Sequence, residues 1–504
     1  MHWPKARREG APRGQCQPYG NDNLPLGLVP QLAGFDFKPL QLDNENAIAA
    51  LRHSPLPERR SSPFRGRGVY RSKTKERCPR AACGKIHRYP RDMRHLAMLS
   101  ILLTLPVGAQ TFNTIHTFAG GAADGALPSA LTVAGEGLLY AVTGQGGLAD
   151  VGIAFSLTPS AIPGPWTETI LYNFAGGSGN GGSGPALTGH SGVLYGVRIA
   201  AGEKQEGTVF ALTPPTSPGG AWTERLLYSF PGGAAGGEPT GSLTVVGRVL
   251  YGATNIGGTS NGGTVFSLAP SASPGGYWTE TVLYSFAGPP GDGAVPSGGL
   301  VVGSGGVLYG TTVQGGTYNA GTVFSLTPPA SPGGIWAETV LYNFKGPFFG
   351  DGAYPAGGLD MDADGVLYGT SDGGAFYDGM VFSLTPPASP GGRWTEAALY
   401  SFVGGSDGAL PSSGVILSNG VLYGTTQYGG PLDGGSVFSL TPPASAGGSW
   451  AEAILHTFGD DSNGCKPSTG LVIGRGGALF GTTAACGNYQ CSTLGCGTVF
   501  SVAP

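Results

Sequence analysis

One short segment has the spacing of a metal-binding loop: DMDADG at 360–365, with Asp360, Asp362 and Asp364. Alternating carboxylates before a turn glycine are typical of calcium loops. The ninth position is Tyr368 instead of an acidic residue, and no Glu follows at the twelfth. Two interpretations therefore stay open, a Ca²⁺ site and an Asp-Gly hairpin turn with solvated neighbours. We expect no other cofactor.

Cysteine chemistry is concentrated near the C-terminus, at Cys465, Cys486, Cys491 and Cys496. An exported protein can keep disulfides. Four cysteines permit three pairings, of which we favour Cys465 with Cys486 and Cys491 with Cys496. A zinc site is the alternative, although no CxxC spacing is present.

Charged residues in turns are candidates for ligand binding. Four Asp residues each precede Gly-Ala in a recurring turn: Asp124, Asp292, Asp351 and Asp407. One loop, VRIAAGEKQEG at 197–207, breaks the pattern of its sister loops with these charged residues: Arg198, Glu203, Lys204 and Glu206. The structural alternatives are an Asp-Gly turn that needs its side chain for geometry, and a solvated charged loop.

Few residues could support catalysis. After residue 109 there are three histidines, and His116 and His456 occupy the Tyr position of an LYxF segment, which makes them strand residues. His190 stands alone beside a turn, so a metal site built from clustered histidines is not supported. A Ser-His-Asp triad has no supporting nucleophile motif such as GxSxG in a strand-turn-helix context. Paired carboxylates that cleave a glycosidic bond stay an open alternative.

These candidates are set in a long tandem repeat. Trp recurs at 166, 222, 278, 336, 394 and 450, and a GTVF-like Phe recurs seven times between Phe155 and Phe500. An LYG aromatic and an LYxF phenylalanine also recur seven times each. Fixed periods of this length indicate a solenoid or a propeller.

Each unit contains four short apolar runs bounded by Gly, Pro, Asn and Asp, which is the pattern of β-strands. In one unit they are GGLVVG (298–303), VLYGTT (307–312), GTVFSLTP (321–328) and WAETVLYNF (336–344), here called strands A to D. Several runs are apolar on successive residues, as expected of strands covered on both faces. A four-stranded sheet between two like sheets is a propeller blade.

The two ends of the repeat region predict a closed ring. TFNTIHTF (111–118) matches strand D, and GTVFSVAP (497–504) matches strand C. Together the half-units make one blade, and their pairing removes two exposed strand edges. We therefore predict an all-β fold, a seven-bladed β-propeller over residues 110–504 whose ring closes by pairing of the two terminal strands. Its C-to-D and A-to-B loops share one face, and its D-to-A and B-to-C loops share the other.

The N-terminal region differs in charge from the repeats. Residues 1–95 hold 19 of the 27 Lys and Arg against 8 acidic residues, a net charge of +11, and the rest carries −15. MRHLAMLSILLTLPVGAQ (93–110) has the basic, apolar and small-residue regions of a signal peptide, assigned to 93–109. Its apolar run is shorter than the roughly 20 residues of a membrane span. We expect Met93 to be the true start, and residues 1–92 to be a mis-called start or a basic disordered extension.

Two resemblances follow from these motifs. The order LYGTT, GG, aromatic strand, Trp is similar to kelch-type blades, although the unit here is longer. LYGTTxxGG followed by GTVFSLTP more closely resembles the GloVer tandem repeat of secreted bacterial "choice-of-anchor" proteins. That resemblance implies export and covers nearly all of residues 110–504. It implies no defined activity, and the ending on a blade strand at Pro504 favours export without an anchor.

We expect a secreted protein, periplasmic or extracellular, with no transmembrane segment after signal cleavage, and a monomer. The favoured function is non-catalytic binding or scaffolding of a glycan, polymer or protein through the polar face of D-to-A and B-to-C loops. The alternative is a secreted carbohydrate-active hydrolase or lyase that uses loop carboxylates. The negative charge of residues 96–504 argues against nucleic acid as a partner.

Overall fold

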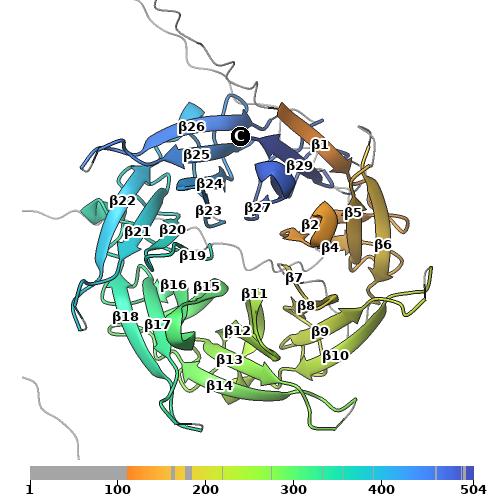
Figure 1. Cartoon of the computed structure of the whole chain (residues 1–504), viewed down its shortest axis with the longest axis horizontal. Helices are drawn as coiled ribbons and strands as arrows, with labels where there is room; N and C mark the ends of the chain where they lie inside the picture. The colour runs from red at the N-terminus through yellow and green to blue at the C-terminus, as the bar shows by residue number, and fades with distance from the viewer. Residues whose placement is uncertain are drawn as a thin grey trace, which may run out of the picture. The chain divides into compact units, whose positions relative to one another are not determined.

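The computed structural model describes residues 111–504 apart from 161–164, 176–183, 185, 218, 274, 332, 356, 390, 412, 446, 460–461, 490 and 492–494. The predicted extension (1–92) and signal peptide (93–109) lie outside the described residues. The described residues form seven antiparallel sheets arranged in a ring (Figure 1). The predicted seven-bladed β-propeller is confirmed.

The strands of each blade run from the centre of the ring outward in the order A to D (Figure 1). The A strands are β2 (Gly125–Pro128) with β3 (Thr132–Val133), β7 (Leu187–His190), β11 (Gly237–Val246), β15 (Gly293–Val302), β19 (Asp360–Met361), β23 (Ile416–Ser418) and β27 (Val472–Ile473). The B strands are β4 (Leu139–Gly146), β8 (Val193–Arg198), β12 (Val249–Ile256), β16 (Leu308–Gly315), β20 (Leu367–Ser371), β24 (Val421–Thr426) and β28 (Leu479–Thr483).

The C strands are β5 (Ile153–Thr158), β9 (Thr208–Thr213), β13 (Thr264–Ala269), β17 (Thr322–Thr327), β21 (Met380–Thr385), β25 (Ser436–Thr441) and β29 (Thr498–Ala503). The D strands are β6 (Thr167–Asn173), β10 (Thr223–Ser229), β14 (Thr279–Ser285), β18 (Ala337–Asn343), β22 (Thr395–Ser401), β26 (Ala451–Thr457) and, from the N-terminal end, β1 (Thr111–Thr117). We number the blades 1 to 7 by their A strands in chain order.

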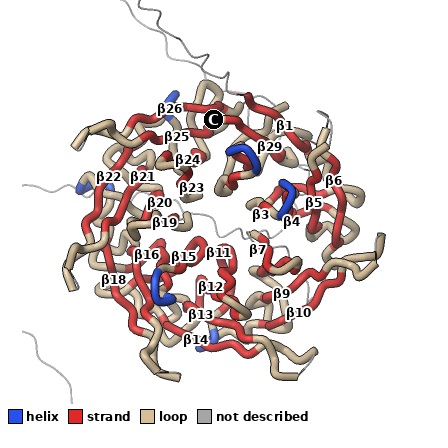
Figure 2. The backbone as a smooth tube through the Cα atoms, in the orientation of Figure 1, coloured by secondary structure: helices blue, strands red, loops and turns tan. Residues whose placement is uncertain are grey.

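The helices are single 3₁₀ turns in the connections between strands (Figure 2). They are η1 (Gly135–Gly137), η2 (Gly233–Ala235), η3 (Ser304–Gly306), η4 (Pro347–Phe349), η5 (Gly405–Asp407) and η6 (Arg475–Gly477). No helix among the described residues is long and apolar enough to cross a membrane.

Ring closure follows the predicted pairing of the two terminal strands. Strand β1 pairs antiparallel with β29, from Thr111 opposite Ala503 to Thr117 opposite Thr498. Blade 7 therefore combines the N-terminal D strand with the A, B and C strands of the C-terminal end. The pairing occupies an edge that would otherwise expose unpaired N–H and C=O groups.

Neighbouring blades are joined by pairs of phenylalanines. The LYxF ring of one blade packs edge-on against the GTVF ring of the next at all seven interfaces, with ring centroids 5.0 to 5.4 Å apart. Phe286 of blade 3 and Phe324 of blade 4 are one such pair, and both are fully buried. Edge-to-face contacts of this kind add to the free energy gained by burying the rings.

Two motif glycines make room for these contacts. A Cβ on Gly310 of LYG would lie 2.7 Å from Cζ of Phe324, the ring that covers it in the same blade. A Cβ on Gly321, which has a φ of 95°, would lie 2.6 Å from Cδ of Pro355 in the next blade. Glycine adopts a positive φ without steric cost and lets the neighbouring chain approach.

We predict that Phe286→Ala lowers the free energy of unfolding by about 3–5 kcal/mol, because it empties a buried aromatic contact between two blades. The measurement is the midpoint of thermal or guanidinium unfolding. Phe348→Ala is the control, since Phe348 is 86% exposed and its loss should cost no more than about 0.5 kcal/mol. Equal effects of the two substitutions would contradict the role given to the phenylalanine pairs.

Candidate functional site

The centre of the ring contains a cavity of about 710 Å³ between the A strands. Its lining combines small and hydroxyl-bearing residues, such as Thr132, Ser297 and Gly357, with leucine and valine side chains such as Leu243 and Val415. Within the part of the chain that the structure describes, the lining includes no charged side chain and no histidine. The cavity thus offers hydroxyl and backbone groups but no general acid, general base or metal ligand from these residues.

The D-to-A turns hold the aspartates that the sequence nominated for binding. The carboxylate of Asp351 accepts hydrogen bonds from the N–H groups of Lys345 and Gly352, at 2.9 and 2.7 Å, and from the Tyr342 hydroxyl at 2.9 Å. Asp124, Asp292 and Asp407 also accept backbone N–H groups of their own turns. These contacts favour the turn interpretation, because the carboxylates fix the chain reversal.

A half-buried glutamate lies beside most of these turns, on the D strand of the following blade. Burial raises the pKa of Glu280, Glu338, Glu396 and Glu452 to about 7. The charge of Asp292 raises the pKa of Glu338 further, and Oε1 of Glu338 is buried with no hydrogen-bond partner among the residues that the structure describes. The interfaces of Glu338, Glu396 and Glu452 therefore each hold a tyrosine, a turn aspartate and a glutamate that resists ionisation. At the interface of Glu280, Tyr228 is present but the turn has no aspartate.

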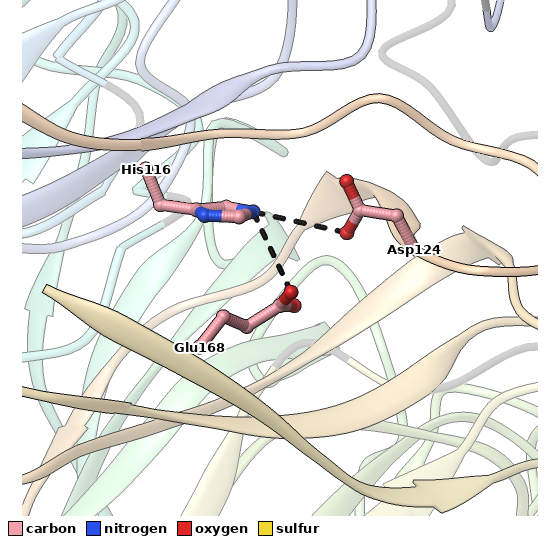
Figure 3. A group of neighbouring side chains, drawn as sticks. All are labelled: His116, Asp124 and Glu168. Atoms are coloured by element: carbon pink, nitrogen blue, oxygen red, sulfur yellow. Dashed lines mark ion pairs between the residues drawn. The ribbon is translucent and has the colours of Figure 1, made fainter.

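The interface between blade 7 and blade 1 has a different composition. His116 of β1 stands where the other units have Tyr or His456, and it faces Asp124 and Glu168 (Figure 3). Its Nε2 lies 3.7 Å from Oδ1 of Asp124 and 3.9 Å from Oε2 of Glu168. These three are the one group of metal-type ligands found among the described residues. The sequence analysis placed His116 in a strand but missed the cluster, although the Tyr-to-His change opposite an Asp-Gly-Ala turn was visible.

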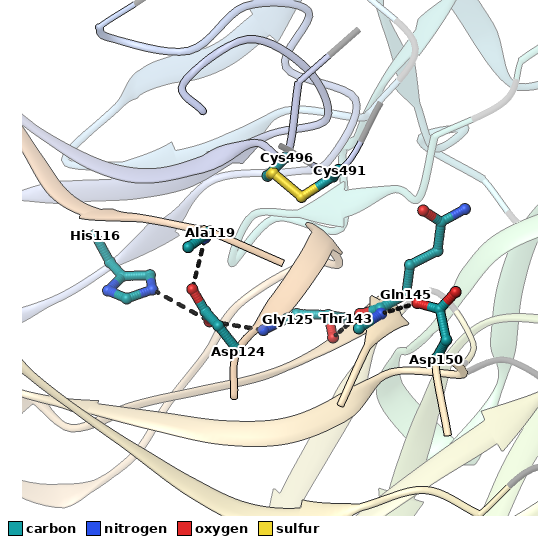
Figure 4. Close-up of a disulfide and its surroundings, with 10 residues drawn as sticks. His116, Ala119, Asp124, Gly125, Thr143, Gln145, Asp150, Cys491 and Cys496 are labelled. Atoms are coloured by element: carbon teal, nitrogen blue, oxygen red, sulfur yellow. Dashed lines mark hydrogen bonds and ion pairs between the residues drawn. A yellow bond between two sulfur atoms is a disulfide. The ribbon is translucent and has the colours of Figure 1, made fainter. Parts of the chain in front are cut away.

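The four C-terminal cysteines form two disulfides, Cys465 to Cys486 and Cys491 to Cys496. This is the pairing that the sequence analysis favoured over the zinc alternative. The Cys491–Cys496 bridge lies near the turn closed by Asp124 (Figure 4). The adjacent B-to-C and D-to-A loops border a cavity of about 590 Å³. Both bridges belong to blade 7, the blade that closes the ring.

The three aspartates of the predicted calcium loop lie at the A-to-B turn of blade 5. Oδ2 of Asp360 accepts the N–H of Leu417 in blade 6 at 2.7 Å. Oδ1 of Asp362 accepts the N–H groups of Asp364 and Val366, each at 2.9 Å. These bonds support the hairpin-turn interpretation, and Ca²⁺ binding stays a prediction.

The charged loop of blade 2 requires one correction. The sequence analysis treated Arg198 as part of an exposed loop, but it ends strand β8 and is fully buried. Its guanidinium lies 4.7 Å from the ring centroids of Phe174 and Phe210 and forms an ion pair with Glu224. Arginine tolerates this position because its flat cation stacks on aromatic faces. In the loop proper, Glu203 and Lys204 are exposed and Glu206 is half-buried.

The loop face of blades 4 and 5 carries exposed aromatic side chains. We call this set the blade 4–5 aromatic patch: Tyr318, Phe348, Phe349, Tyr354, Phe376 and Tyr377. Tyr318 and Phe348 each lie 5.5 Å from Phe349 between ring centroids. The sequence analysis missed the patch because its rings come from three loops that read as ordinary turns.

A buried carboxylate lies beside the blade 4–5 aromatic patch. Asp372 is 7% exposed, and its Oδ1 has no hydrogen-bond partner among the described residues. Its N–H donates to the carbonyl of Tyr354 at 3.4 Å. Burial raises the pKa of Asp372 to about 6. The loop of Asp372 is one residue shorter than the B-to-C loop of blade 4, so this blade departs from its sisters.

Sequence comparison decides the family. The profile of the Gloeobacter/Verrucomicrobia repeat matches residues 100–301, 217–415 and 370–504. The chain belongs to the Gloeobacter/Verrucomicrobia repeat family. Kelch-type and "choice-of-anchor" relationships stay predictions. No curated protein matches this member of the family.

Several solved structures are similar to this repeat-family protein at low identity. An oxidoreductase (glucose dehydrogenase) from Thermus thermophilus is 15% identical over 78% of this chain and 100% of its own, with a TM-score of 0.34. A Trypanosoma rangeli sialidase in complex with sialic acid is 13% identical over 69% and 56%, with a TM-score of 0.33. An exo-β-1,3-galactanase from Phanerochaete chrysosporium is 13% identical over 54% and 60%, with a TM-score of 0.30.

We predict that the glutamates at the blade interfaces make stability fall as pH rises. The pKa of Glu338 is raised from 4.5 to about 7 in the folded protein, so between these values the folded state binds more protons than the unfolded state. The free energy of unfolding then decreases from pH 4.5 to about pH 7 and levels off above it.

The test is the melting temperature of Glu338→Gln from pH 5 to pH 8. At pH 8 this variant should melt higher than the wild type by on the order of 2 °C, and at pH 5 the difference should shrink. Glu203→Gln is the matched control, because Glu203 is exposed. A constant offset across the pH range would argue against titration of Glu338.

Proposed function

We propose that this Gloeobacter/Verrucomicrobia repeat protein is an exported, non-catalytic propeller that binds a glycan through its D-to-A and B-to-C loop face. The observation that carries the proposal is the blade 4–5 aromatic patch. Solvent-exposed aromatic rings gathered on one face mark interaction sites. Tyr277 and Ile335 are also exposed, but they belong to C-to-D loops on the opposite face and lie in different blades.

The chemistry of the patch suits a carbohydrate. An aromatic ring has a negative face, which attracts the partly positive C–H groups on the flat side of a pyranose. Binding sites combine such apolar surfaces with a few polar groups that fix orientation. The hydroxyl groups of the exposed Tyr318 and Tyr377 can supply such contacts. Asp372 lies beside these rings, but its Oδ1 is buried.

The alternative, a hydrolase or lyase that uses loop carboxylates, has weaker support. The Asp-Gly-Ala carboxylates hold their own turns, as Asp292 does by accepting the N–H groups of Ala287 and Gly293 at 2.6 Å. Asp372 is the acidic residue on this face whose raised pKa suits a general acid. The same experiment separates the two functions.

We predict that the wild-type protein retains glycans on an array of bacterial and plant polysaccharides without releasing products. Phe348→Ala combined with Phe349→Ala should weaken binding by at least about tenfold, and Asp372→Asn by less, since aromatic anchors dominate such contacts. Tyr277→Ala is the matched control on the opposite face and should leave binding unchanged. If the wild type releases reducing ends and Asp372→Asn does not, the hydrolase alternative is favoured. If the Phe348→Ala, Phe349→Ala double variant retains glycans as well as the wild type does, glycan binding by the blade 4–5 aromatic patch is refuted.

Export is the second part of the proposal. Two disulfides in blade 7 suit an oxidising compartment, where such bonds persist. We predict that mass spectrometry of the exported protein finds an N-terminus at Gln110 and a mass four hydrogens below that of the reduced chain. An N-terminus at Met1, or four free thiols in the secreted fraction, would contradict it.

A further inference from the structure

The cluster of His116, Asp124 and Glu168 lies between strand β1 of blade 7 and strand β6 of blade 1 (Figure 3). At the equivalent interface between blades 4 and 5, the Tyr342 hydroxyl donates a hydrogen bond to Asp351. His116 makes no such bond, because 3.7 and 3.9 Å exceed hydrogen-bonding distance. The three side chains therefore face a shared gap instead of bonding to one another.

The facing atoms are buried and lack partners. Nε2 of His116 and Oε1 of Glu168 are both buried without a hydrogen-bond partner among the described residues. The three side chains are 20%, 13% and 17% exposed, in the order His116, Asp124 and Glu168, so the cluster is not sealed from solvent. One ligand atom from each residue lies within 4.8 Å of the others. Buried polar atoms without hydrogen-bond partners destabilise the folded protein unless a ligand binds between them.

We propose that His116, Asp124 and Glu168 bind one divalent transition-metal ion, such as Zn²⁺, at the junction of blade 7 and blade 1. One imidazole nitrogen and two carboxylate oxygens are ligands that Zn²⁺ accepts, with a fourth position left for water. Donors around a tetrahedral Zn²⁺ lie about 3.4 Å apart, given bond lengths near 2.1 Å. The two separations from Nε2 of His116, 3.7 and 3.9 Å, need to close by a few tenths of an ångström. The separation between the two carboxylate oxygens is at most 4.8 Å and needs to close by no more than about 1.4 Å.

Backbone groups hold Asp124 in place for this role. Its Oδ1 accepts the N–H of Gly125, and its Oδ2 accepts the N–H of Ala119, each at 2.6 Å (Figure 4). A carboxylate oxygen has two lone pairs, so Oδ1 can accept this hydrogen bond and still bind an ion. Hydrogen bonds of this kind orient ligands in metal sites.

The local charge also favours a cation. Among the described residues, no lysine or arginine forms an ion pair with Asp124 or Glu168. Burial raises the pKa of Glu168, and the neighbouring charge of Asp124 raises it further, whereas His116 lowers it. A divalent ion would neutralise both carboxylates where a single imidazole cannot.

The chain supplies an internal control at the interface of blades 6 and 7. His456 holds the position equivalent to His116, but Phe112 and Asn463 replace the glutamate and the aspartate. The His456 ring stacks on Phe112 with centroids 3.6 Å apart and planes 7° apart. Since Phe112 and Asn463 supply no carboxylate at these two positions, we expect this histidine to bind no comparable ion.

The experiment is isothermal titration of the full, oxidised chain with ZnCl₂ after removal of metal by EDTA. Residues 1–110 contain further cysteines and histidines that can also bind Zn²⁺. Zn²⁺ binding at the proposed site is therefore measured as the difference between the wild type and each variant. His116→Tyr restores the residue of the sister blades and should bind one Zn²⁺ fewer than the wild type. Glu168→Gln should weaken that site at least about tenfold, and His456→Tyr should leave it intact. Zn²⁺ should raise the melting temperature of the wild type more than that of His116→Tyr.

Equal Zn²⁺ binding by the wild type and His116→Tyr would overturn the proposal. Near-ultraviolet circular dichroism in EDTA shows whether His116→Tyr folds. Should it fail to fold, Co²⁺ absorption decides: d–d bands present in the wild type and in His456→Tyr, but lost in Glu168→Gln, support the site. Bands unchanged in Glu168→Gln refute it.

Discussion

The edge-to-face contact between the phenylalanines of consecutive blades is the interaction on which the ring depends. It fixes the distance and tilt between sheets that share no hydrogen-bonded strands. The contact also explains the motifs: Gly310 leaves space for the ring of Phe324, and Gly321 leaves space for the proline of the next blade. Because each blade both supplies and receives a ring, the array is complete only when the last blade meets the first.

A polar layer accompanies this aromatic layer at the blade interfaces. Where Tyr342 meets Asp351, a hydroxyl bonds to a turn carboxylate and closes the chain reversal. Burial of the nearby glutamates raises their pKa values, as it does for Glu396. Replacing tyrosine by His116 at one interface keeps the fold but exchanges a hydroxyl donor for a metal-type ligand. A single substitution at one blade interface can thus create a set of metal-type ligands without adding a strand or a loop.

The other candidate binding residues also lie where one blade differs in sequence from its sister blades. Among the described residues the lining of the central cavity is uncharged, because each blade contributes only glycine, alanine, hydroxyl-bearing or aliphatic residues to it. Blade 5 differs, since its shorter loop carries Asp372 and lies among exposed rings such as Phe348 and Phe376. The loops tolerate these departures because they do not contribute to the contacts between sheets.

The sequence alone determined the strands, the number of blades and the closure by TFNTIHTF, because spacing within a repeat reports strand register directly. It favoured one of three disulfide pairings, and the tertiary structure decided between them. The sequence did not determine which side chains meet across an interface. Arg198 reads as a loop charge yet is buried between two rings, and His116 reads as a strand residue yet faces Asp124 and Glu168. Phe174 lies on a different blade from Arg198, and Glu168 lies on a different blade from His116, so only the packing of one sheet against the next brings these pairs together.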